Sequence, residues 1–507
     1  MLKSLETTGI SSGRNFDLDF GSRLNVLTGD NGLGKSFVLE LIWWSITGDW
    51  TERPVIGDKG SFHNAKITSR FSHNELTDDS TSTFNPRKSR WRFSRRSALK
   101  PSLVIYATAS GSFHIWDRLR NIQPDAHSHG MVLDGPPMEA VPYRLEPEAL
   151  WNGLSIDGKK KCKGLVEDLV DWQTQSSPVK TAAYELFNKV LSVVSNPLEP
   201  LVLSKPRRLY LDDIREFPVI KFSYEETPVE HCSSGVKRIL GLAYSIVWAW
   251  IEHLAAAELT NEKPGDEILF LIDEPESHLH PSWQRSIIPS LLNNLTKSLV
   301  PSPAIQWVMT THSPLVLTSI EPFFQTESDR LFCFQTGKDS VEVTQEEWSL
   351  NGDTIGWLTS DIFGLNSTRS KEAEILITEA SALMEANSEN SVLDEIEKQL
   401  TKLISNFDPF WSQWRFYREQ QKLKLIVFSG GELADQACKI AYELPHQLSF
   451  QLLNAQNLWS TYVRSPLQET NSILYVHSGT GSVLPTGSAF YMATVRGNKL
   501  VTIQPNV

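Results

Sequence analysis

The chain has 507 residues, 40% of them hydrophobic and 21% charged, and its formal net charge is −12 at pH 7. These values are typical of a globular protein and exclude a general attraction to nucleic acid or anionic lipid. Four scattered cysteines, Cys162, Cys232, Cys333 and Cys438, fit neither a disulfide framework nor a zinc site. The first residues do not form a signal peptide, and the longest apolar run, 239–251, is too short to span a bilayer. We therefore expect a cytoplasmic protein without membrane contact.

Two short strands are expected within residues 1–23, and the most specific motif of the chain follows them. A β-prone run leads into Gly29-Asp-Asn-Gly-Leu-Gly-Lys-Ser36, and an apolar helix begins near Phe37. This octapeptide matches the phosphate-binding pattern G-x-x-x-x-G-K-[ST] in its strand–loop–helix context. Glycines let backbone N–H groups turn towards a phosphate, and the helix N-terminus adds positive potential. We predict a nucleoside-triphosphate site formed by Gly29, Asp30, Asn31, Gly32, Leu33, Gly34, Lys35, Ser36 and Phe37.

Two side chains of this loop have chemical roles in the prediction. Lys35 can reach the β- and γ-phosphates, so we count it among the catalytic residues. The Ser36 hydroxyl is placed to bind Mg²⁺. ATP and Mg²⁺ are therefore the expected cofactors.

A β-rich insert is expected at about residues 60–120. Short β-prone runs are separated by polar turns, and the polar stretch 76–89 is typical of a mobile loop. The runs lie at 66–71, 91–93, 103–107 and 113–116.

A basic cluster lies inside this insert, interleaved with Trp91 and Phe93. One interpretation is a nucleic-acid contact, in which cations bind phosphates and the rings stack on bases. The other is a solvated strand whose alternate aromatic residues face the core, and the alternation favours it. Both stay open. The cations are Arg87, Lys88, Arg90, Arg92, Arg95, Arg96 and Lys100.

Residues 146–200 are expected to form a helical lid with a break near 176–178, and the basic run 159–163 to open a surface helix. Sustained heptads are absent between the phosphate loop and residue 230, so the lid should be compact. Ser233, Ser234 and Gly235 then precede an apolar helix at 239–255. Small residues at a helix N-terminus can bind an anion, although Ser-Ser-Gly is also a common helix cap.

Two adjacent acids end a buried strand at 268–272. Asp273 and Glu274 would be costly inside a core, but beside a magnesium triphosphate each has a function. Asp273 can hold the metal through water, and Glu274 can orient and deprotonate the attacking water. A further buried strand at 305–310 leads to His312, which can hydrogen-bond the γ-phosphate. We therefore predict Glu274, His312 and Lys35 as catalytic residues, and Ser36 and Asp273 as metal ligands.

The order of these motifs resembles that of the ATP-binding-cassette (ABC) ATPases of the SMC, RecF and OLD type, as far as about residue 320. The resemblance implies an α/β fold, an ABC-ATPase head with a mixed β-sheet, a P-loop core and a helical lid. In that family a signature segment, usually L-S-G-G-Q, caps the γ-phosphate held by the other subunit. Residues 232–236 take its place, keep Ser233 and Gly235 and differ at three of five positions. Gln123 is the candidate for the Q-loop and 276–281 for the D-loop.

Further segments are similar to PtuA-like ATPases of anti-phage defence, found in Septu and in some retron systems. They are S-S-G-V-K-R-I-L-G-L-A-Y, W-L-T-S-D-I-F-G-L at 357–365 and D-P-F-W at 408–411. This resemblance implies a homo-oligomer, a dimer or a dimer of dimers, that controls a separate effector protein such as a nuclease. No D-x-D occurs after residue 312, and only His446 and His477 follow it, so we expect no nuclease site in this chain.

Two alternative functions remain at this point. One is a DNA-repair ATPase of RecF or Rad50 type that binds DNA directly through the basic cluster between Arg87 and Lys100. The other is a nucleotide-gated scaffold that binds ATP with negligible turnover. The departures in the signature segment keep this second alternative open.

We expect three domains. An ABC-type ATPase domain would cover 1–345, and a helical extension 346–420, in which a charged helical region is ended by 408–411. A small α/β domain of unknown role would cover 421–507, with strands near 423–428, 473–477 and 489–495. Its segment Gly479-Thr-Gly-Ser482 could bind phosphate, but it lacks a lysine and a clear helix after it, so a turn is favoured.

Overall fold

The computed structural model divides the chain into two compact units, Met1–Thr368 and Arg369–Val507. For residue 390 and for residues from 419 onwards only the backbone is described. The residues that the structure describes are 1–10, 15–51, 54–55, 65–74, 76–93, 99–121, 141–337, 340–386, 390–422, 425–428, 450–453, 472–476, 489–496 and 499–505.

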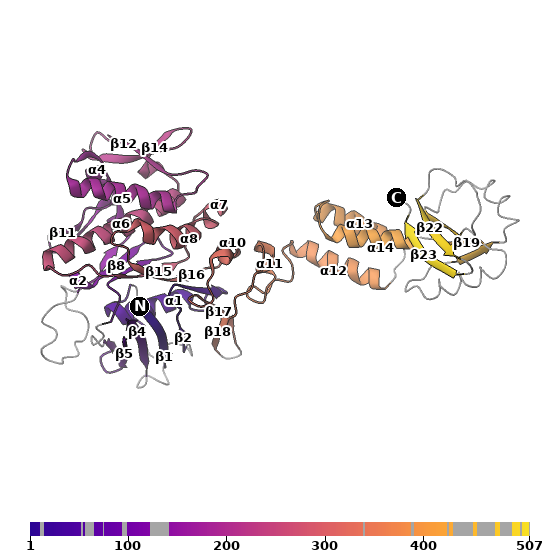
Figure 1. Ribbon diagram of the computed structural model, residues 1–507, viewed down its shortest axis with the longest axis horizontal. Coiled ribbons are helices and arrows are strands. Elements are labelled where there is room, and N and C mark those ends of the chain that lie inside the picture. Colours follow the sequence, from indigo (N-terminus) through magenta and orange to yellow (C-terminus); the bar gives the residue numbers. More distant parts are fainter. Residues whose placement is uncertain are drawn as a thin grey trace. The chain divides into compact units, whose positions relative to one another are not determined.

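An eight-stranded mixed sheet forms the centre of the first unit (Figure 1). Its five middle strands run parallel, and the strands outside them pair antiparallel. The mixed α/β fold expected from the sequence is therefore confirmed. In spatial order the strands are β18 (Val341–Glu346), β17 (Arg330–Thr336), β3 (Leu24–Gly29), β16 (Ala304–Thr310), β15 (Glu267–Asp273), β7 (Leu103–Ala107), β8 (Phe113–Asp117) and β9 (Tyr143–Leu145).

Helix α6 (Ser234–Thr260) covers one face of this sheet, and helix α1 (Lys35–Thr47) covers the other. Successive side chains of a strand point to opposite faces, so a strand covered on both sides is apolar throughout. On β15, Phe270 belongs to the hydrophobic cluster of α6 and Leu271 to that of α1. The uninterrupted apolar run before Asp273 is thus explained by burial from both sides.

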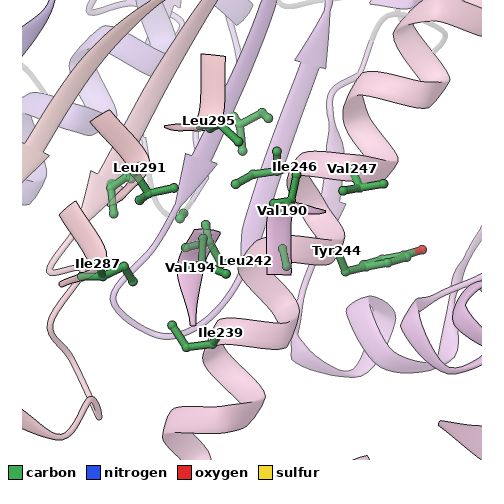
Figure 2. Close-up of a cluster of buried hydrophobic side chains, with 14 of the residues drawn as sticks. Val190, Val194, Ile239, Leu242, Tyr244, Ile246, Val247, Ile287, Leu291 and Leu295 are labelled. Atoms are coloured by element: carbon green, nitrogen blue, oxygen red, sulfur yellow. The ribbon is translucent and has the colours of Figure 1, made fainter. Parts of the chain in front are cut away.

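The α6 face carries the lid and several short helices (Figure 1). Val190 and Val194 of the lid share one cluster with Leu242 and Ile246 of α6 and with Leu291 (Figure 2). The elements are α2 (Arg118–Asn121), α3 (Pro147–Asn152), β10 (Leu154–Ile156), β11 (Lys159–Cys162), α4 (Leu165–Thr174), α5 (Pro178–Val194), β12 (Val202–Arg208), β13 (Glu216–Lys221), β14 (Glu226–Pro228), η3 (Val229–His231), α7 (Pro281–Gln284), α8 (Ile287–Ser290), η4 (Leu291–Leu295), α9 (Thr296–Ser298), α10 (Pro314–Ile320), η5 (Glu321–Phe323) and α11 (Thr354–Leu358).

The basic run 159–163 corrects one expectation, because it does not open a helix. Residues Lys159–Cys162 form strand β11, which pairs antiparallel with β10 across a short turn. Asp157 and Gly158 of that turn have φ of 50° and 72°, the left-handed conformation of a tight hairpin. A run of lysines is compatible with an exposed strand and with an exposed helix. The Asp-Gly turn before it indicates a hairpin, and therefore a strand.

The α1 face carries a five-stranded antiparallel sheet, and here a second expectation was wrong. Residues 76–85, expected in a loop, form a strand that pairs with its neighbours on both sides. Its residues alternate between buried and exposed, but the buried ones include Ser80 and Ser82, so the alternation carries little hydrophobic signal. The strands in spatial order are β2 (Asp17–Asp19), β1 (Leu2–Thr8), β4 (Lys66–His73), β5 (Leu76–Asn85) and β6 (Arg90–Arg92).

The second unit begins with three helices that share a core containing Leu376, Leu400 and Trp414. Residues 408–411 begin the third helix, whereas we expected them to end the helical region. Asp408 Oδ1 accepts a hydrogen bond from the Phe410 N–H at 2.9 Å, as a helix-capping residue does. The helices are α12 (Lys371–Glu385), α13 (Asn390–Leu403) and α14 (Phe410–Lys422).

Strands follow these helices, and the three expected there are present. β19 pairs with β20, and β21, β22 and β23 form a second sheet. The segment 479–482 lies outside the described residues. The strands are β19 (Leu425–Phe428), β20 (Phe450–Leu453), β21 (Ser472–Val476), β22 (Ala489–Arg496) and β23 (Lys499–Pro505).

One helix in the described part of the chain, α6, is long and apolar enough to cross a membrane by length and composition. Its most apolar window is 78% buried inside the structure, and α6 lies against the central sheet. Its hydrophobicity is therefore that of a core helix.

Candidate functional site

The phosphate-loop motif forms the turn between β3 and α1. Gly29, Gly32 and Gly34 have φ of 125°, 78° and 102°, values that residues other than glycine rarely adopt. At Gly29 a Cβ atom would also lie 2.1 Å from the carbonyl oxygen of Phe334. Helix α1 begins directly at Lys35, so the N–H groups of its first turn lack partners within the helix. This backbone fits a phosphate, because inward N–H groups and a helix N-terminus meet at one place.

Lys35 lies across this loop. Its side chain is buried, and Nζ donates hydrogen bonds to the carbonyl oxygens of Gly29 at 2.9 Å and Asp30 at 2.7 Å. Burial lowers the pKa of Lys35 to about 8, against the opposing effect of Glu274 and Asp273. The ammonium group therefore lies in the field of both acids.

The remaining residues of the motif are placed differently. Asp30, Asn31, Gly32 and Ser36 are exposed, and Leu33 is buried in the core beneath α1. Phe37 packs against that core with its ring centroid 6.2 Å from that of Phe16. Only its backbone N–H can therefore face a phosphate.

The predicted metal ligands lie together. Asp273 Oδ1 accepts hydrogen bonds from Ser36 Oγ at 2.8 Å and from Thr310 Oγ1 at 2.6 Å. A hydroxyl and a carboxylate are hard oxygen ligands, and two of them suit a Mg²⁺ ion whose other ligands are phosphate oxygens and water. Groups of three or more His, Cys, Asp or Glu side chains suited to a metal are absent among the described residues. The donor set therefore fits a magnesium triphosphate better than a protein-only metal centre.

Glu274 follows Asp273 in an unusual conformation. Its φ is 47°, in the left-handed region, which costs a non-glycine residue about 1–3 kcal/mol. Three contacts hold it there: its N–H donates to Thr310 Oγ1 at 3.0 Å, its Oε2 accepts from Ser277 Oγ at 2.9 Å, and its carbonyl accepts from Arg238 at 3.3 Å. Strain that is maintained by surrounding contacts is typical of catalytic positions.

His312 lies beside this acid. Its Nε2 is 3.5 Å from Glu274 Oε1. Burial, and then the charge of Lys35, lower the pKa of His312 below its usual value. Both effects favour the neutral imidazole, and the structure brings His312, Glu274 and the phosphate loop together.

The signature residues belong to α6, on the other face of the sheet from α1. Ser233 caps this helix, with Oγ accepting from the Val236 N–H at 3.4 Å, and both Ser233 and Ser234 are exposed. A Cβ atom on Gly235 would lie 2.9 Å from the carbonyl oxygen of His278, so the first turn of α6 packs tightly on the segment 276–281. The exposed hydroxyls face solvent at the start of a 27-residue helix.

Two residues near the acids were not among the predicted site residues, although Glu276 begins the segment 276–281 that was the candidate for the D-loop. Arg238 donates to the carbonyl oxygens of Thr108, Ala109, Asp273 and Glu274 at 3.1–3.3 Å, and so connects α6 to the ends of β7 and β15. Glu276 accepts hydrogen bonds from the segment that carries His312. The Lys-Arg pair after the signature could have indicated the first, whereas nothing in the spacing distinguishes Glu276 from a surface acid.

The basic cluster is divided by the structure. Trp91 and Phe93 are buried in the core beneath α1, so neither ring is available to stack on a base. Lys100 is buried too, with Nζ bound to the carbonyl oxygen of Ile46 at 2.8 Å and 4.2 Å from the Phe93 ring centroid. Its inclusion in a surface cluster was wrong, because an aliphatic stem can lie along a core while the ammonium reaches a carbonyl. Arg87, Lys88, Arg90 and Arg92 are exposed, and Arg95, Arg96 and Gln123 lie outside the described residues.

Two family models match the chain. One, described as "AAA domain, putative AbiEii toxin, Type IV TA system", covers residues 219–318, and one described as "AAA domain" covers residues 4–118. The second contains the phosphate loop, and the first contains the signature segment, both acids and His312. AAA domains are ATPase domains. The two matches together include the phosphate loop, the signature segment, both acids and His312.

Relatives match over different parts of the chain. A "Septu protein PtuA" of Bacillus thuringiensis is 23% identical over 415 residues, 78% of this chain and 93% of that protein. A "Retron Ec83 probable ATPase" of Escherichia coli is 38% identical over 190 residues, 37% of this chain and 31% of that protein. Among solved structures, the SMC head domain from Thermotoga maritima aligns with a TM-score of 0.32 and 15% identity, covering 68% of this chain and 99% of that one.

Proposed function

We propose a function from the premise that this chain is an ATPase related to the PtuA-like proteins of anti-phage defence, a resemblance that the matches confirm. In the proposal two copies of the chain enclose two ATP molecules, and the resulting dimer controls a separate effector, a nuclease. One copy supplies Lys35, Ser36, Asp273, Glu274 and His312 to each site, and the other supplies Ser233, Ser234 and Gly235.

The convergence of three segments at one sheet edge carries this proposal. Parallel strands β3, β15 and β16 end beside each other, and the polar groups that follow them are in contact. Asp273 contacts Ser36, Glu274 contacts His312, and Lys35 lies in the field of both acids. Carboxyl ends of parallel strands are the usual place for nucleotide sites.

Each side chain then has a defined task. Lys35 and the loop N–H groups neutralise phosphate charge, and Ser36 and Asp273 hold Mg²⁺, which when bound draws charge from the phosphate oxygens. Because Ser277 occupies Oε2 of Glu274, Oε1 is the oxygen that takes a proton from the attacking water. Neutral His312 donates a hydrogen bond to the γ-phosphate, so its contact depends on whether that phosphate is present.

Two-fold pairing supplies the second half of both sites at once. The exposed hydroxyls at the start of α6 suit a γ-phosphate held by another copy, since a helix N-terminus attracts anions. ATP binding then closes the dimer and hydrolysis opens it, so the γ-phosphate shifts an equilibrium between two states.

Solution mass tests this part of the proposal. Glu274→Gln retains the shape of the side chain but not the base, so with ATP the variant should accumulate as a closed, ATP-loaded dimer. Wild-type protein should dimerise transiently under the same conditions. Ser233→Ala combined with Glu274→Gln should dimerise less, because one trans contact is lost. A monomer of Glu274→Gln in saturating ATP would refute the enclosed-nucleotide dimer.

The effector part needs a separate experiment. When the native operon is expressed and this chain is purified, a second polypeptide with nuclease motifs should co-purify with it. The rate at which that polypeptide cleaves nucleic acid should depend on whether ATP is bound to this chain. The relative named Septu protein PtuA supports a defence context. A chain that purifies alone and binds DNA in a salt-dependent manner would instead favour a repair ATPase.

A further inference from the structure

Glu276 is a half-buried acid that the proposed mechanism does not use. It lies three residues after Asp273, and its Oε1 accepts hydrogen bonds from Thr311 Oγ1 at 2.7 Å and from the His312 N–H at 2.9 Å. Its Oε2 is also buried, and within the described residues it has no hydrogen-bond partner. Both bonds therefore go to the two residues that place the His312 ring.

The same short segment is fixed on its other side. The Ser313 N–H donates to Thr311 Oγ1 at 3.0 Å, and Ser313 Oγ donates to Gln284 Oε1 at 3.0 Å. Residues 311–313 are thus attached to the turn after β15 and to α7. The His312 ring lies 3.5 Å from Glu274, and the backbone that carries it is held by the hydrogen bonds to Glu276 and Gln284.

Asp329 is a buried acid whose carboxyl group is paired differently from that of Glu276. Asp329 uses both oxygens: Arg23, the Leu24 N–H and the Gln325 N–H all bind it. Glu276 uses one oxygen and has no cation among its hydrogen-bond partners, although a buried carboxyl group is costly without full pairing. Burial accordingly raises the pKa of Glu276. An acid paired in this incomplete way is more simply explained by its effect on His312 than by a contribution to the stability of the fold.

We propose that Glu276 is a positioning residue for His312, whose backbone it fastens to the acidic turn so that the imidazole stays between the phosphate loop and Glu274. The proposal rests on the function proposed above, since it assumes that His312 takes part in ATP turnover. Loss of Glu276 should then lower kcat, while ATP affinity, which Lys35 and the loop provide, should hardly change.

Two substitutions of similar volume separate the hydrogen bonds from packing. Glu276→Gln retains an acceptor oxygen for both donors, and Glu276→Met fills the space without one. Hydrogen exchange of the peptide covering 311–316, measured on the nucleotide-free full chain, should rise in Glu276→Met and stay near wild type in Glu276→Gln. Unchanged exchange in Glu276→Met would overturn the attachment whether or not the protein hydrolyses ATP.

Turnover then shows whether the attachment acts through His312. Alone, Glu276→Met should lower kcat by about 10- to 100-fold, the range expected for a misplaced catalytic group, with KM within about threefold of wild type. In a His312→Ala background the same change should cost less than about twofold, because the group to be positioned is gone. Equal losses in both backgrounds would overturn the proposal and leave Glu276 a purely structural residue.

A matched control uses Glu321, an acid outside the site. Its Oε1 accepts from the N–H groups of Asn351 and Gly352 and from Trp357 Nε1, at 2.5–3.3 Å. Glu321→Met should lower thermal stability and leave kcat near wild type. If wild type itself has no turnover, the proposed function fails, while the exchange result still decides whether Glu276 holds the 311–313 segment.

Discussion

Two buried aspartates lie at opposite ends of the parallel strands, and their surroundings differ. We call these two ends the edges of the parallel core. Asp329, just before β17, is paired with Arg23 and bonded by backbone N–H groups of Leu24 and Gln325. The carboxylate of Asp273, at the end of β15, accepts hydrogen bonds from the hydroxyls of Ser36 and Thr310, and the ion pairs found among the described residues do not include it. Burial alone does not separate these acids, since both are nearly inaccessible. The absence of an ion pair among the described residues does, and it marks Asp273 as the acid that suits a metal.

The largest effect is expected for Asp273, the acid that hydroxyl groups bind. Asp273→Asn should lower ATP turnover by at least about 100-fold, because the charge proposed to hold the metal is lost, while thermal stability stays equal or rises. The measurement is steady-state hydrolysis against Mg²⁺ concentration, together with the melting temperature. Normal turnover in this variant would remove Asp273 from the site and end the contrast between the two edges.

The opposite result is expected at the paired acid. Asp329→Asn leaves Arg23 partly buried without its partner, so the free energy of unfolding should fall by about 3–5 kcal/mol. Turnover per folded molecule should remain near wild type, because Asp329 lies at the far edge from the phosphate loop. Urea unfolding and an activity assay corrected for the folded fraction check this. A large loss of turnover at full folding would mean that the two edges are coupled.

The residues at these edges differ in how far the sequence alone reveals them. The phosphate loop and the acidic pair could be predicted because each is contiguous and follows an apolar strand. Arg238 and Glu276 could not, since their partners are backbone groups and the Thr311 hydroxyl, all far away in the chain. Similarly, β5 was missed because its buried face contains Ser80 and Ser82, whose burial depends on neighbouring strands. Motifs identify groups that meet a ligand, and they miss groups whose task is to hold other residues.

A third buried group tests whether an unsatisfied polar atom alone indicates function. His114, on β8, is buried between Trp43 and Tyr106, its Nδ1 has no hydrogen-bond partner in the described structure, and burial lowers its pKa to about 4. Glu146 and Arg144 are the charged groups that act on it, in opposite directions. His114 lies on β8, which β7 separates from β15 and its acids. We therefore expect it to affect stability without affecting turnover.

The sign of its pH effect follows from where the proton binds. An unfolded histidine has a pKa near 6.5, so between about pH 6.5 and 4 the unfolded chain binds the proton and the folded protein does not. Stability should fall by about 2–3 kcal/mol over this range and level off below it. His114→Phe should remove this part of the pH dependence. Unfolding free energies of both proteins from pH 7 to 4 give the difference, and parallel curves would contradict the prediction.

The smallest expected effect uses two threonines on adjacent parallel strands. Thr310 Oγ1 donates to Asp273 and accepts from the Glu274 N–H, whereas Thr28 Oγ1 is equally buried and has no hydrogen-bond partner in the described structure. Valine has nearly the shape of threonine and suits a strand. Thr310→Val should lower kcat by about tenfold and unfolding free energy by about 1 kcal/mol, the value of a typical buried hydrogen bond.

Thr28→Val serves as the control, since it removes a hydroxyl that has no hydrogen-bond partner in the described structure. It should leave stability equal or higher and turnover unchanged. Equal losses from both substitutions would show that any hydroxyl at this edge matters, for example through packing around the loop. A loss confined to Thr310→Val would show that the edge works through one hydroxyl, which links the acid suited to Mg²⁺ to Glu274, the strained residue proposed to activate water.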